Sequence, residues 1–510
     1  MTKDLDRAKN HFDLALNFIN LSDFESAEKE LVAANTLCPN RISILVNLSC
    51  TLVNLHKWDA NIRICSEILN IDNTNLDGLI NLAITYHQLS QATLAKEYIS
   101  RALEINPESH SAWSNFGNIA LDNKDYIKAK EYFETSIALN PRSEESYIGL
   151  GNLLNEQSEY KKAIDCFDSA LSINPSNLLA SWNKSLSLLR LGDFANGWRL
   201  YESRWHILGM KQNKKNLSTE LWLGDFPISG QVIHIYSEQG YGDIIQMARF
   251  LPIIETKFSA QVIFETSNPL FELTKSLSPS MTIIRTNEVP ITKDGLAPTF
   301  HCPIMSLPLA FKTQINSIPQ ETPYLFANAS KTLRWSALFN KLPWPSKDKP
   351  PFRIGICTQG SGHYAGKPNS KRDIPGSLVN QILTACHQLP IEWHSLNVIK
   401  DSSINSSVSL IDNSNDLIDF DETAALINNL DLIISVDTAV GHLAGALGKS
   451  VIVMLPNPPD FLSGIENTRS LWYTSMEYLR QLEPGVWPIE ALAHKIQLIC
   501  NTHFQTKYHP

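Results

Sequence analysis

The sequence predicts a two-part fold: an all-α solenoid of helical repeats, followed by an α/β region with two parallel-sheet lobes and a cleft between them. Two observations lead to this prediction. One position recurs every 34 residues through the first two fifths of the 510-residue chain, and it holds Pro39, Asn73, Pro107, Pro141 and Pro175. Beyond residue 215, short apolar runs alternate with helix-like segments, a pattern typical of parallel sheets covered by helices.

Other positions of the 34-residue period indicate how the helices pack. A small residue recurs at Ala27, Ala95, Ala129 and Ala163, with Asn61 as the exception, and a bulky one at Leu31, Ile99, Phe133 and Phe167. Small residues let two antiparallel helices approach closely, and a proline ends the second helix. Gly117 and Gly151 fit the tight site in the first helix of their repeats.

This pattern resembles the tetratricopeptide repeat, and we assign about five repeats to residues 5–176. A further helix pair and a linker, residues 177–215, are expected to cap the array. Arrays of this kind expose a concave groove, which we expect to bind a protein, peptide or glycan acceptor. Self-association into a homodimer, or simple bracing of the α/β region, are the alternatives.

The α/β region divides at a proline- and lysine-rich stretch, residues 341–352. The first Rossmann-like lobe is placed at 216–345 and the second at 352–500. Strands are expected at 231–236, 261–266, 281–285, 299–303, 353–358, 391–396, 432–437 and 450–455, and helices at 243–254, 376–388, 421–429 and 439–447. Ligands bind at the carboxyl ends of such strands, so the glycine-containing loops that open the two lobes should face one cleft.

The first of these loops reads "SEQGYGD" and joins a strand to a helix. It holds Glu238, Gln239 and Asp243, together with Gly240 and Gly242, which allow a tight turn close to a ligand.

The second informative segment is "DLIISVDTAVGHLAGALG", where a buried strand runs into a helix rich in small residues. We expect Asp437 to cap that helix, and Thr438 to begin it. A helix start offers backbone N–H groups and a positive dipole end, which favour a diphosphate. His442, about one turn into the helix, could donate a hydrogen bond to a phosphate oxygen. The alternative is an ordinary strand–helix unit with a buried histidine.

The loop that follows strand 353–358 contains Gly360 and the paired cations Lys371 and Arg372. In an acidic protein, paired cations at the carboxyl end of a strand suit an anionic ligand. A solvated, lysine-rich loop is the alternative.

Together, "EQGYGD" and "DTAVGHLAGALG" resemble a bacterial family of tetratricopeptide-repeat proteins with a heptosyltransferase-like, family 9-like glycosyltransferase domain. The architecture is also similar to that of the O-linked N-acetylglucosamine transferases. The resemblance implies a GT-B fold whose first lobe binds the acceptor and whose second lobe binds a nucleotide-sugar. It further implies Asp243 as general base, a diphosphate cradle formed by Asp437, Thr438 and His442, and donor contacts from Lys371 and Arg372.

Two features leave these roles open. Asp243 could merely cap its helix while Glu238 and Gln239 hold the loop, and capping would make its carboxylate a weak base. The chain also departs from the family, which usually has tryptophan near the end of the strand that here ends in Thr358. Phe461-Leu462-Ser463 stands where the family has an aromatic–arginine–aromatic sequence.

The sequence predicts a metal-independent, inverting glycosyltransferase that moves a sugar from a nucleotide-sugar to a protein or glycan acceptor, with no further cofactor. The alternative is a non-catalytic scaffold with a degenerate transferase domain. A net charge of −9 argues against nucleic acid as partner, and the chain has no apolar run that suits a membrane span. Eight scattered cysteines without a CxxC pair suit the cytoplasm. The acidic stretch "DFDE", 419–422, is not expected to bind metal.

Overall fold

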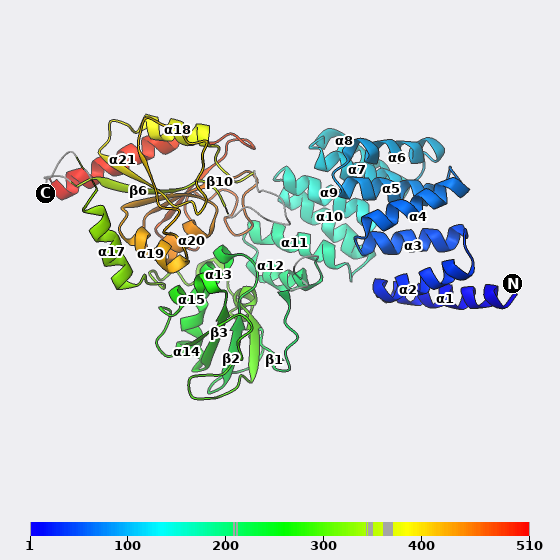
Figure 1. The fold of residues 1–510 in the computed structure, drawn as a ribbon, viewed down its shortest axis with the longest axis horizontal. Coiled ribbons are helices and arrows are strands. Elements are labelled where there is room, and N and C mark those ends of the chain that lie inside the picture. The colour runs from blue at the N-terminus through cyan, green and yellow to red at the C-terminus, as the bar shows by residue number, and fades with distance from the viewer. Residues whose placement is uncertain are drawn as a thin grey trace. The chain divides into compact units, whose positions relative to one another are not determined.

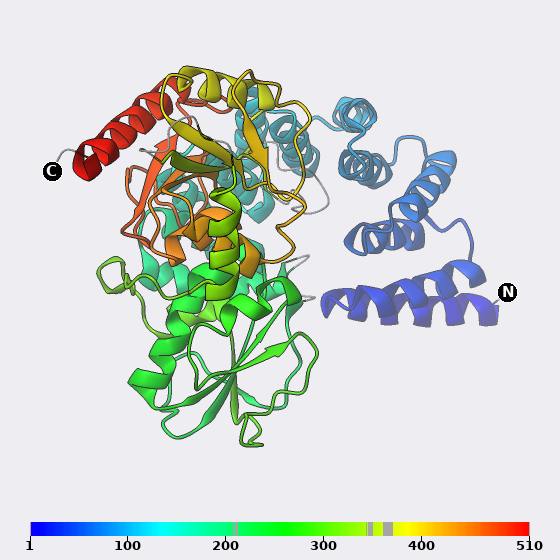
Figure 2. The same ribbon diagram turned by 60° about the vertical axis from the view of Figure 1, so that its left-hand side comes forward.

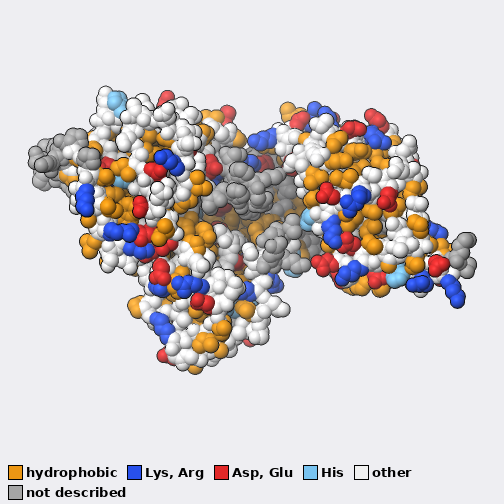
Figure 3. Space-filling model, in the orientation of Figure 1, with side chains coloured by type: hydrophobic (Ala, Val, Ile, Leu, Met, Phe, Trp, Pro, Cys, Tyr) orange, Lys and Arg blue, Asp and Glu red, His pale blue; other side chains and the backbone are white. Residues whose placement is uncertain are grey.

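A computed structural model describes residues 2–207, 210, 213–342, 344, 350–360 and 371–508. The chain divides into two compact units, Met1–Ala180 and Ser181–Pro510. Figure 1 labels the elements of both. On the face drawn in Figure 3, acidic, basic and apolar side chains are interspersed. Among the described residues, no helix combines the length and the apolar character needed to cross a bilayer.

The first unit is the all-helical repeat array that the sequence predicts. Its antiparallel pairs are α1 (Thr2–Asn20) with α2 (Phe24–Leu37), α3 (Ile42–Asn54) with α4 (Trp58–Ile71), α5 (Leu76–Gln88) with α6 (Ala92–Ile105), α7 (His110–Asp122) with α8 (Tyr126–Leu139), and α9 (Glu144–Glu156) with α10 (Tyr160–Ile173). The recurring small and bulky residues, such as Ala129 and Phe133, are fully buried. The array is therefore held by the periodic residues themselves.

Two glycines allow neighbouring helices of the array to pack closely. A β-carbon on Gly117 would lie 2.6 Å from the Phe133 ring, and one on Gly151 would lie 2.5 Å from the Phe167 ring. Asn61, the exception among the small residues, is buried in a polar network instead. It accepts a hydrogen bond from the Ser49 hydroxyl at 2.7 Å and donates one to the Thr85 hydroxyl at 2.7 Å.

The turn within each helix pair has a conformational signature that sequence reasoning missed. One residue per turn adopts a left-handed backbone with positive φ, and these residues follow the 34-residue period: Ser22, His56, Ser90, Lys124, Ser158 and Gly192. The last of these lies between α11 (Leu178–Arg190) and α12 (Phe194–Tyr201). The helix pair that was expected to cap the array thus repeats the same turn.

This last pair also contributes to the core of the second unit. Trp198 and Tyr201 of α12 are fully buried in one apolar cluster with Ile233 and Ile235 of the first sheet. Residues 202–206 then form a short 3-10 helix, which carries the fully buried Arg204.

The first lobe contains a five-stranded parallel sheet in the order β1-β5-β2-β3-β4. Its strands are β1 (Glu220–Leu221), β2 (Val232–Tyr236), β3 (Gln261–Thr266), β4 (Thr282–Arg285) and β5 (Phe300–Pro303). Helices α13 (Tyr241–Met247), α14 (Leu251–Phe258) and α15 (Asn268–Thr274) contribute to the large apolar cluster of this unit, and α16 (Leu307–Ala310) follows β5. The helix expected at 243–254 is broken by a 3-10 turn, because Pro252, the second residue of α14, has no backbone N–H.

The second lobe contains a six-stranded parallel sheet in the order β11-β10-β9-β6-β7-β8. Its strands are β6 (Phe352–Cys357), β7 (Ile391–Ser395), β8 (Leu410–Asp412), β9 (Leu432–Val436), β10 (Val451–Leu455) and β11 (Met476–Arg480). Numbered within the lobe, this order is 3-2-1-4-5-6, that of dinucleotide-binding Rossmann folds. The order reverses between β6 and β9, so the crevice at their carboxyl ends is where such a sheet binds ligands.

Helices cover both faces of this sheet (Figures 1 and 2). On one face, α18 (Gly376–Ala385) and α21 (Ile489–Tyr508) pack on Ile354, Ile434 and Ile452. On the other, α19 (Phe420–Asn428) and α20 (Ala439–Ala446) pack on Ile433 and Val453. The short helix α20 is thereby fixed at the carboxyl end of β9.

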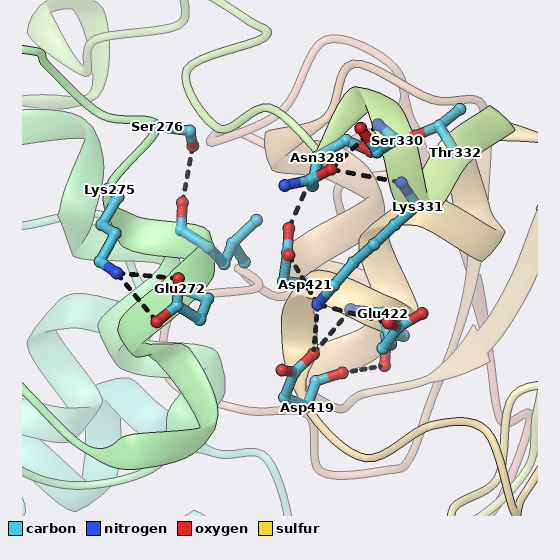
Figure 4. Close-up of polar contacts among 12 residues, drawn as sticks. Glu272, Lys275, Ser276, Asn328, Ser330, Lys331, Thr332, Asp419, Asp421 and Glu422 are labelled. Carbon is cyan, nitrogen blue, oxygen red and sulfur yellow. Dashed lines mark hydrogen bonds and ion pairs between the residues drawn. The ribbon is translucent and has the colours of Figure 1, made fainter. Parts of the chain in front are cut away.

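The linker helix α17 (Ala329–Phe339) joins the lobes and is tied to α19 by an ion cluster (Figure 4). Lys331 Nζ lies 3.6 Å from Asp419, 2.7 Å from Asp421 and 3.3 Å from Glu422. Arg334 forms a further ion pair with Glu422. The acidic stretch 419–422 is therefore engaged in holding α17 to the second lobe.

A second connection between the lobes is buried. Arg249, after α13, donates a hydrogen bond to the backbone carbonyl of Trp472 in the second lobe and lies 4.4 Å from the centre of the Tyr473 ring. The Tyr324 hydroxyl donates to the Ile245 carbonyl at 2.9 Å and lies 3.2 Å from the Tyr473 hydroxyl. These bonds fix α13 against the second lobe.

Candidate functional site

The loops that sequence analysis singled out in the two lobes meet in the structure. Helix α13 of the first lobe packs against α20 of the second. A β-carbon on Gly242 would lie 2.9 Å from Cδ2 of His442 and 3.5 Å from the backbone nitrogen of Ala439. The glycine is thus required because the turn of the first lobe passes directly over the start of α20.

Asp243 occupies the third position of α13 and is half-buried. Its Oδ2 accepts a hydrogen bond from the Gly240 N–H at 3.2 Å, as capping requires. Burial nevertheless raises the pKa of Asp243, and the neighbouring Asp437 adds to that rise, although His442 and the Gly240 N–H oppose it. The carboxyl is therefore a stronger base than capping alone would make it.

Glu238 and Gln239 both contact the segment before the first sheet. Glu238 is buried and accepts hydrogen bonds from Arg204 Nη2 and from the Met305 N–H, each at 3.0 Å. Gln239 has a φ of +66° and accepts a hydrogen bond from the Tyr201 hydroxyl at 3.0 Å. These contacts suit the alternative in which the two residues hold the loop.

The expectation that Asp437 caps α20 was wrong. Thr438 is the N-cap residue, and its side chain makes no capping hydrogen bond. The Thr438 hydroxyl lies instead 3.1 Å from the Ser435 hydroxyl, because the hydroxyl turns back toward the end of β9. The backbone N–H groups of the first turn are therefore left without a side-chain cap.

His442 lies beside Asp437 of its own lobe and close to Asp243 of the first lobe. Its Nε2 lies 3.7 Å from Asp437 Oδ1, with about a fifth of the side chain exposed (21%). Its Nδ1 is buried and has no hydrogen-bond partner among the described residues. A histidine with an unsatisfied ring nitrogen next to an uncapped helix start suits an anionic ligand.

Gly360 and Arg372 lie together at the same strand ends. A β-carbon on Gly360 would lie 2.5 Å from Arg372 Nη2, so the guanidinium lies directly over this glycine. Arg372 Nη1 donates to the Asp437 carbonyl at 2.9 Å, which brings the cation to the end of β9. Lys371 is exposed. The rest of this predicted loop, residues 361–370, lies outside the described part of the chain.

Other residues, which the sequence did not indicate, also lie near the site. A small pocket between the lobes is lined by Asp437 and His442, and also by Gln246, Asp460, Ser463 and Tyr478. The surrounding protein and the carboxylates Asp437 and Asp243 raise the pKa of Asp460 to about 7. Its position, five residues past the end of a buried strand next to β9, was a signal that could have found it.

The residues that depart from the family pattern, at positions 358 and 461–463, are packed against neighbouring side chains. Thr358 is buried and exchanges hydrogen bonds of 2.9 Å with the Asn397 side chain. Leu462 and Ser463 are buried at the pocket wall, and Phe461 packs 5.6 Å from the Tyr201 ring. Apolar side chains and hydroxyl groups therefore occupy the positions where the family has tryptophan and arginine.

Comparison with protein-family models matches both parts of the chain. Residues 76–109, 110–143 and 144–177 match the tetratricopeptide repeat. Residues 417–468, which include the end of β9, α20 and Asp460, match glycosyltransferase family 9 (heptosyltransferase). The chain thus joins tetratricopeptide repeats to a family 9-like glycosyltransferase segment.

A curated relative is similar over most of both chains. Protein FlbA of Caulobacter vibrioides is 22% identical over 498 residues, covering 93% of this chain and 81% of its own. Two of the similar solved structures are described as tetratricopeptide-repeat proteins. One from Thermus thermophilus is 18% identical, covers 36% of this chain and 99% of its own, and has a TM-score of 0.34. One from Parabacteroides merdae is 20% identical, covers 39% and 80%, and has a TM-score of 0.30.

Proposed function

We propose that the chain is a glycosyltransferase that moves a sugar from a nucleotide-sugar donor to a protein or glycan acceptor. The observation that carries the proposal is the placement of Asp243, on the first lobe, across from the start of α20 and His442, on the second. A base and a diphosphate-binding helix start on opposite walls of one cleft are the two groups that such a transfer needs.

The second lobe offers the donor site. Its strand order reverses between β6 and β9, where Thr438 leaves the start of α20 uncapped. The positive end of the helix dipole and the first-turn N–H groups suit a diphosphate. Arg372 would add a positive charge at the same strand ends, and His442 Nδ1 would donate a hydrogen bond.

The transfer that this geometry supports is a direct displacement. The acceptor oxygen forms a bond to the anomeric carbon as the bond from that carbon to the phosphate oxygen breaks. The nucleoside diphosphate leaves with the bonding electrons, and the acceptor proton goes to the Asp243 carboxylate. Because the base and the leaving group lie on opposite sides of the sugar, the anomeric configuration inverts.

In this proposal, fixed charges of the protein stabilise the leaving group. Negative charge that develops on the diphosphate would meet the helix start, Arg372 and His442, which are held in place before the reaction. We therefore propose a transfer that needs no metal ion and no cofactor besides the donor. Addition of a chelator should leave the rate unchanged.

In this proposal, the repeats bind the acceptor. Repeat arrays bind partners along an extended concave surface, and the first unit is an array of five helix pairs. We propose a protein, peptide or glycan acceptor for this surface. A homodimer and a cytoplasmic location stay predictions from the sequence.

The experiment that tests this function follows release of nucleoside diphosphate. Purified chain is incubated with a panel of nucleotide-sugars and a cell extract that supplies acceptors, with and without a chelator. Release that needs both donor and extract, and that Asp243→Asn abolishes, supports the transferase. Donor binding without release by any member of the panel would favour the alternative, a scaffold whose transferase domain has lost catalysis.

A further inference from the structure

Asp460 lies at the carboxyl edge of the second sheet, in the loop after β10, which pairs with β9. Its side chain lines the same pocket as Asp437 and His442. The carboxyl is fixed by one local bond, from the Leu462 N–H to Oδ1 at 3.1 Å, and the residue is otherwise exposed. The other carboxylate oxygen makes no hydrogen bond to the residues that the structure describes.

Asp460 lies near the groups that carry both halves of the proposed reaction. Its charge interacts with Asp437, beside the proposed diphosphate site, and with Asp243, the proposed base on the other lobe. A transferred sugar must lie between the diphosphate site and the base, because its anomeric carbon lies between the leaving phosphate and the acceptor oxygen. Asp460 therefore borders the space in which the sugar has to lie.

The chemistry around Asp460 suits hydroxyl groups. The hydroxyl-bearing side chains Ser463, Ser470 and Tyr478 line the same pocket. A carboxylate oxygen accepts hydrogen bonds from hydroxyls, and a protonated carboxyl can also donate one. With a pKa of about 7, Asp460 has both forms available near neutral pH.

The loop that carries Asp460 is also braced from outside the sheet. Arg190, the last residue of α11, donates through Nε to the Pro459 carbonyl at 3.4 Å, and its charge stabilises the ionised form of Asp460. This contact makes Arg190 a positioning residue for the loop. A carboxyl held in place in this way is suited to selective recognition of a ligand.

We propose that Asp460 binds the hydroxyl groups of the transferred sugar and so helps to select the donor. The ligand class is a nucleotide-linked pyranose with free hydroxyls on adjacent carbons, to which a carboxylate can bind through both oxygens. The inference rests on the proposed function, because it takes the diphosphate to lie at the start of α20.

The test separates binding of the sugar from binding of the diphosphate. Calorimetric titrations at pH 7.5 compare UDP with UDP-N-acetylglucosamine, GDP with GDP-mannose, and ADP with ADP-glucose, for the wild-type chain and for Asp460→Asn. Asparagine keeps the oxygen that accepts the Leu462 N–H, so the loop should stay folded. Glu466→Gln, an exposed acid in the same loop, is the matched control.

For the pair that the wild-type chain binds, Asp460→Asn should weaken the nucleotide-sugar by about tenfold or more, as expected for a lost hydrogen bond to a charged group. The diphosphate alone should change by less than about threefold, and Glu466→Gln should change neither. Equal shifts for both ligands, or no shift, would overturn the role of Asp460. A wild-type chain that binds no nucleoside diphosphate would instead overturn the proposed function, and this inference with it.

Discussion

Gly242 of the first lobe faces His442 of the second so closely that a β-carbon at position 242 would lie 2.9 Å from the ring. The turn that carries Asp243 therefore depends on a glycine to reach the start of α20. Two motifs about 200 residues apart in sequence lie against each other because the buried Arg249 network holds α13 against the second lobe.

Gly242→Ala should separate the two lobes locally. The added methyl group has to displace the His442 ring or the start of α20, at a cost of about 1–3 kcal/mol for overpacking. We expect a lower melting temperature and weaker binding of nucleoside diphosphate. Gly240→Ala is the comparison, because its φ of −76° suits alanine and the new β-carbon would meet only a side-chain oxygen, Asp243 Oδ2, at 3.2 Å. Equal effects of both changes would contradict the close contact at position 242.

Asp243→Asn should remove the base and keep the fold. Turnover is expected to fall by about 10²–10⁴-fold, while donor affinity and melting temperature stay close to wild type. Steady-state rates and calorimetry on the same preparation check this. Full activity would exclude Asp243 as the base.

Glu238→Gln, in the same turn, should show the opposite pattern. It leaves the fully buried Arg204 without its main ion-pair partner, and breaking a buried pair costs about 3–5 kcal/mol. A clear drop in melting temperature is therefore expected, measured by calorimetry. A stable variant with a selective loss of turnover would instead place Glu238 in the chemistry.

His442→Ala should weaken nucleoside diphosphate binding by about 1–3 kcal/mol, because a hydrogen bond to a charged phosphate is lost. Isothermal titration measures the change. His494→Ala, on α21, is the control. His394→Ala would be unsuitable, because His394 is buried against Glu392 and Phe339. Unchanged affinity in His442→Ala, with the fold intact, would remove His442 from the site.

The stability of the second unit should depend on the ionisation of Asp460. Its pKa is raised to about 7 in the folded chain, above the value of an unfolded aspartate, so the folded state binds more protons between these values. The contribution of Asp460 to stability is therefore present at low pH and is lost as pH rises toward 7. Asp460→Asn should raise the melting temperature relative to wild type more at pH 8 than at pH 5. An equal difference at both values would contradict the assigned pKa.

Much of the α/β fold could be predicted because its central strands are continuous apolar runs. All eight expected strands are present, whereas β1, β8 and β11 were missed. β1 and β8 have two and three residues, and β11 carries charged residues at an edge of the sheet, so none has the apolar length that marks a buried strand.

Only those residues of the candidate site that come directly after a strand could be predicted from the sequence. Asp243, Asp437 and His442 each follow a recognisable strand, and a parallel sheet brings such residues to one edge. Asp460 and Arg190 were not predicted, because their position depends on a turn after β10 and on the packing of α11 within the second unit. The Thr438 cap was also missed, since sequence alone does not show whether Asp437 or Thr438 leaves the helical conformation.

The most direct measurement is a crystal structure of the full chain with the nucleoside diphosphate that it binds. We expect the phosphates to lie at the first turn of α20, within hydrogen-bond distance of His442 and near Arg372, with Asp243 across from them on the first lobe. A diphosphate bound elsewhere, with the start of α20 still unoccupied, would contradict it.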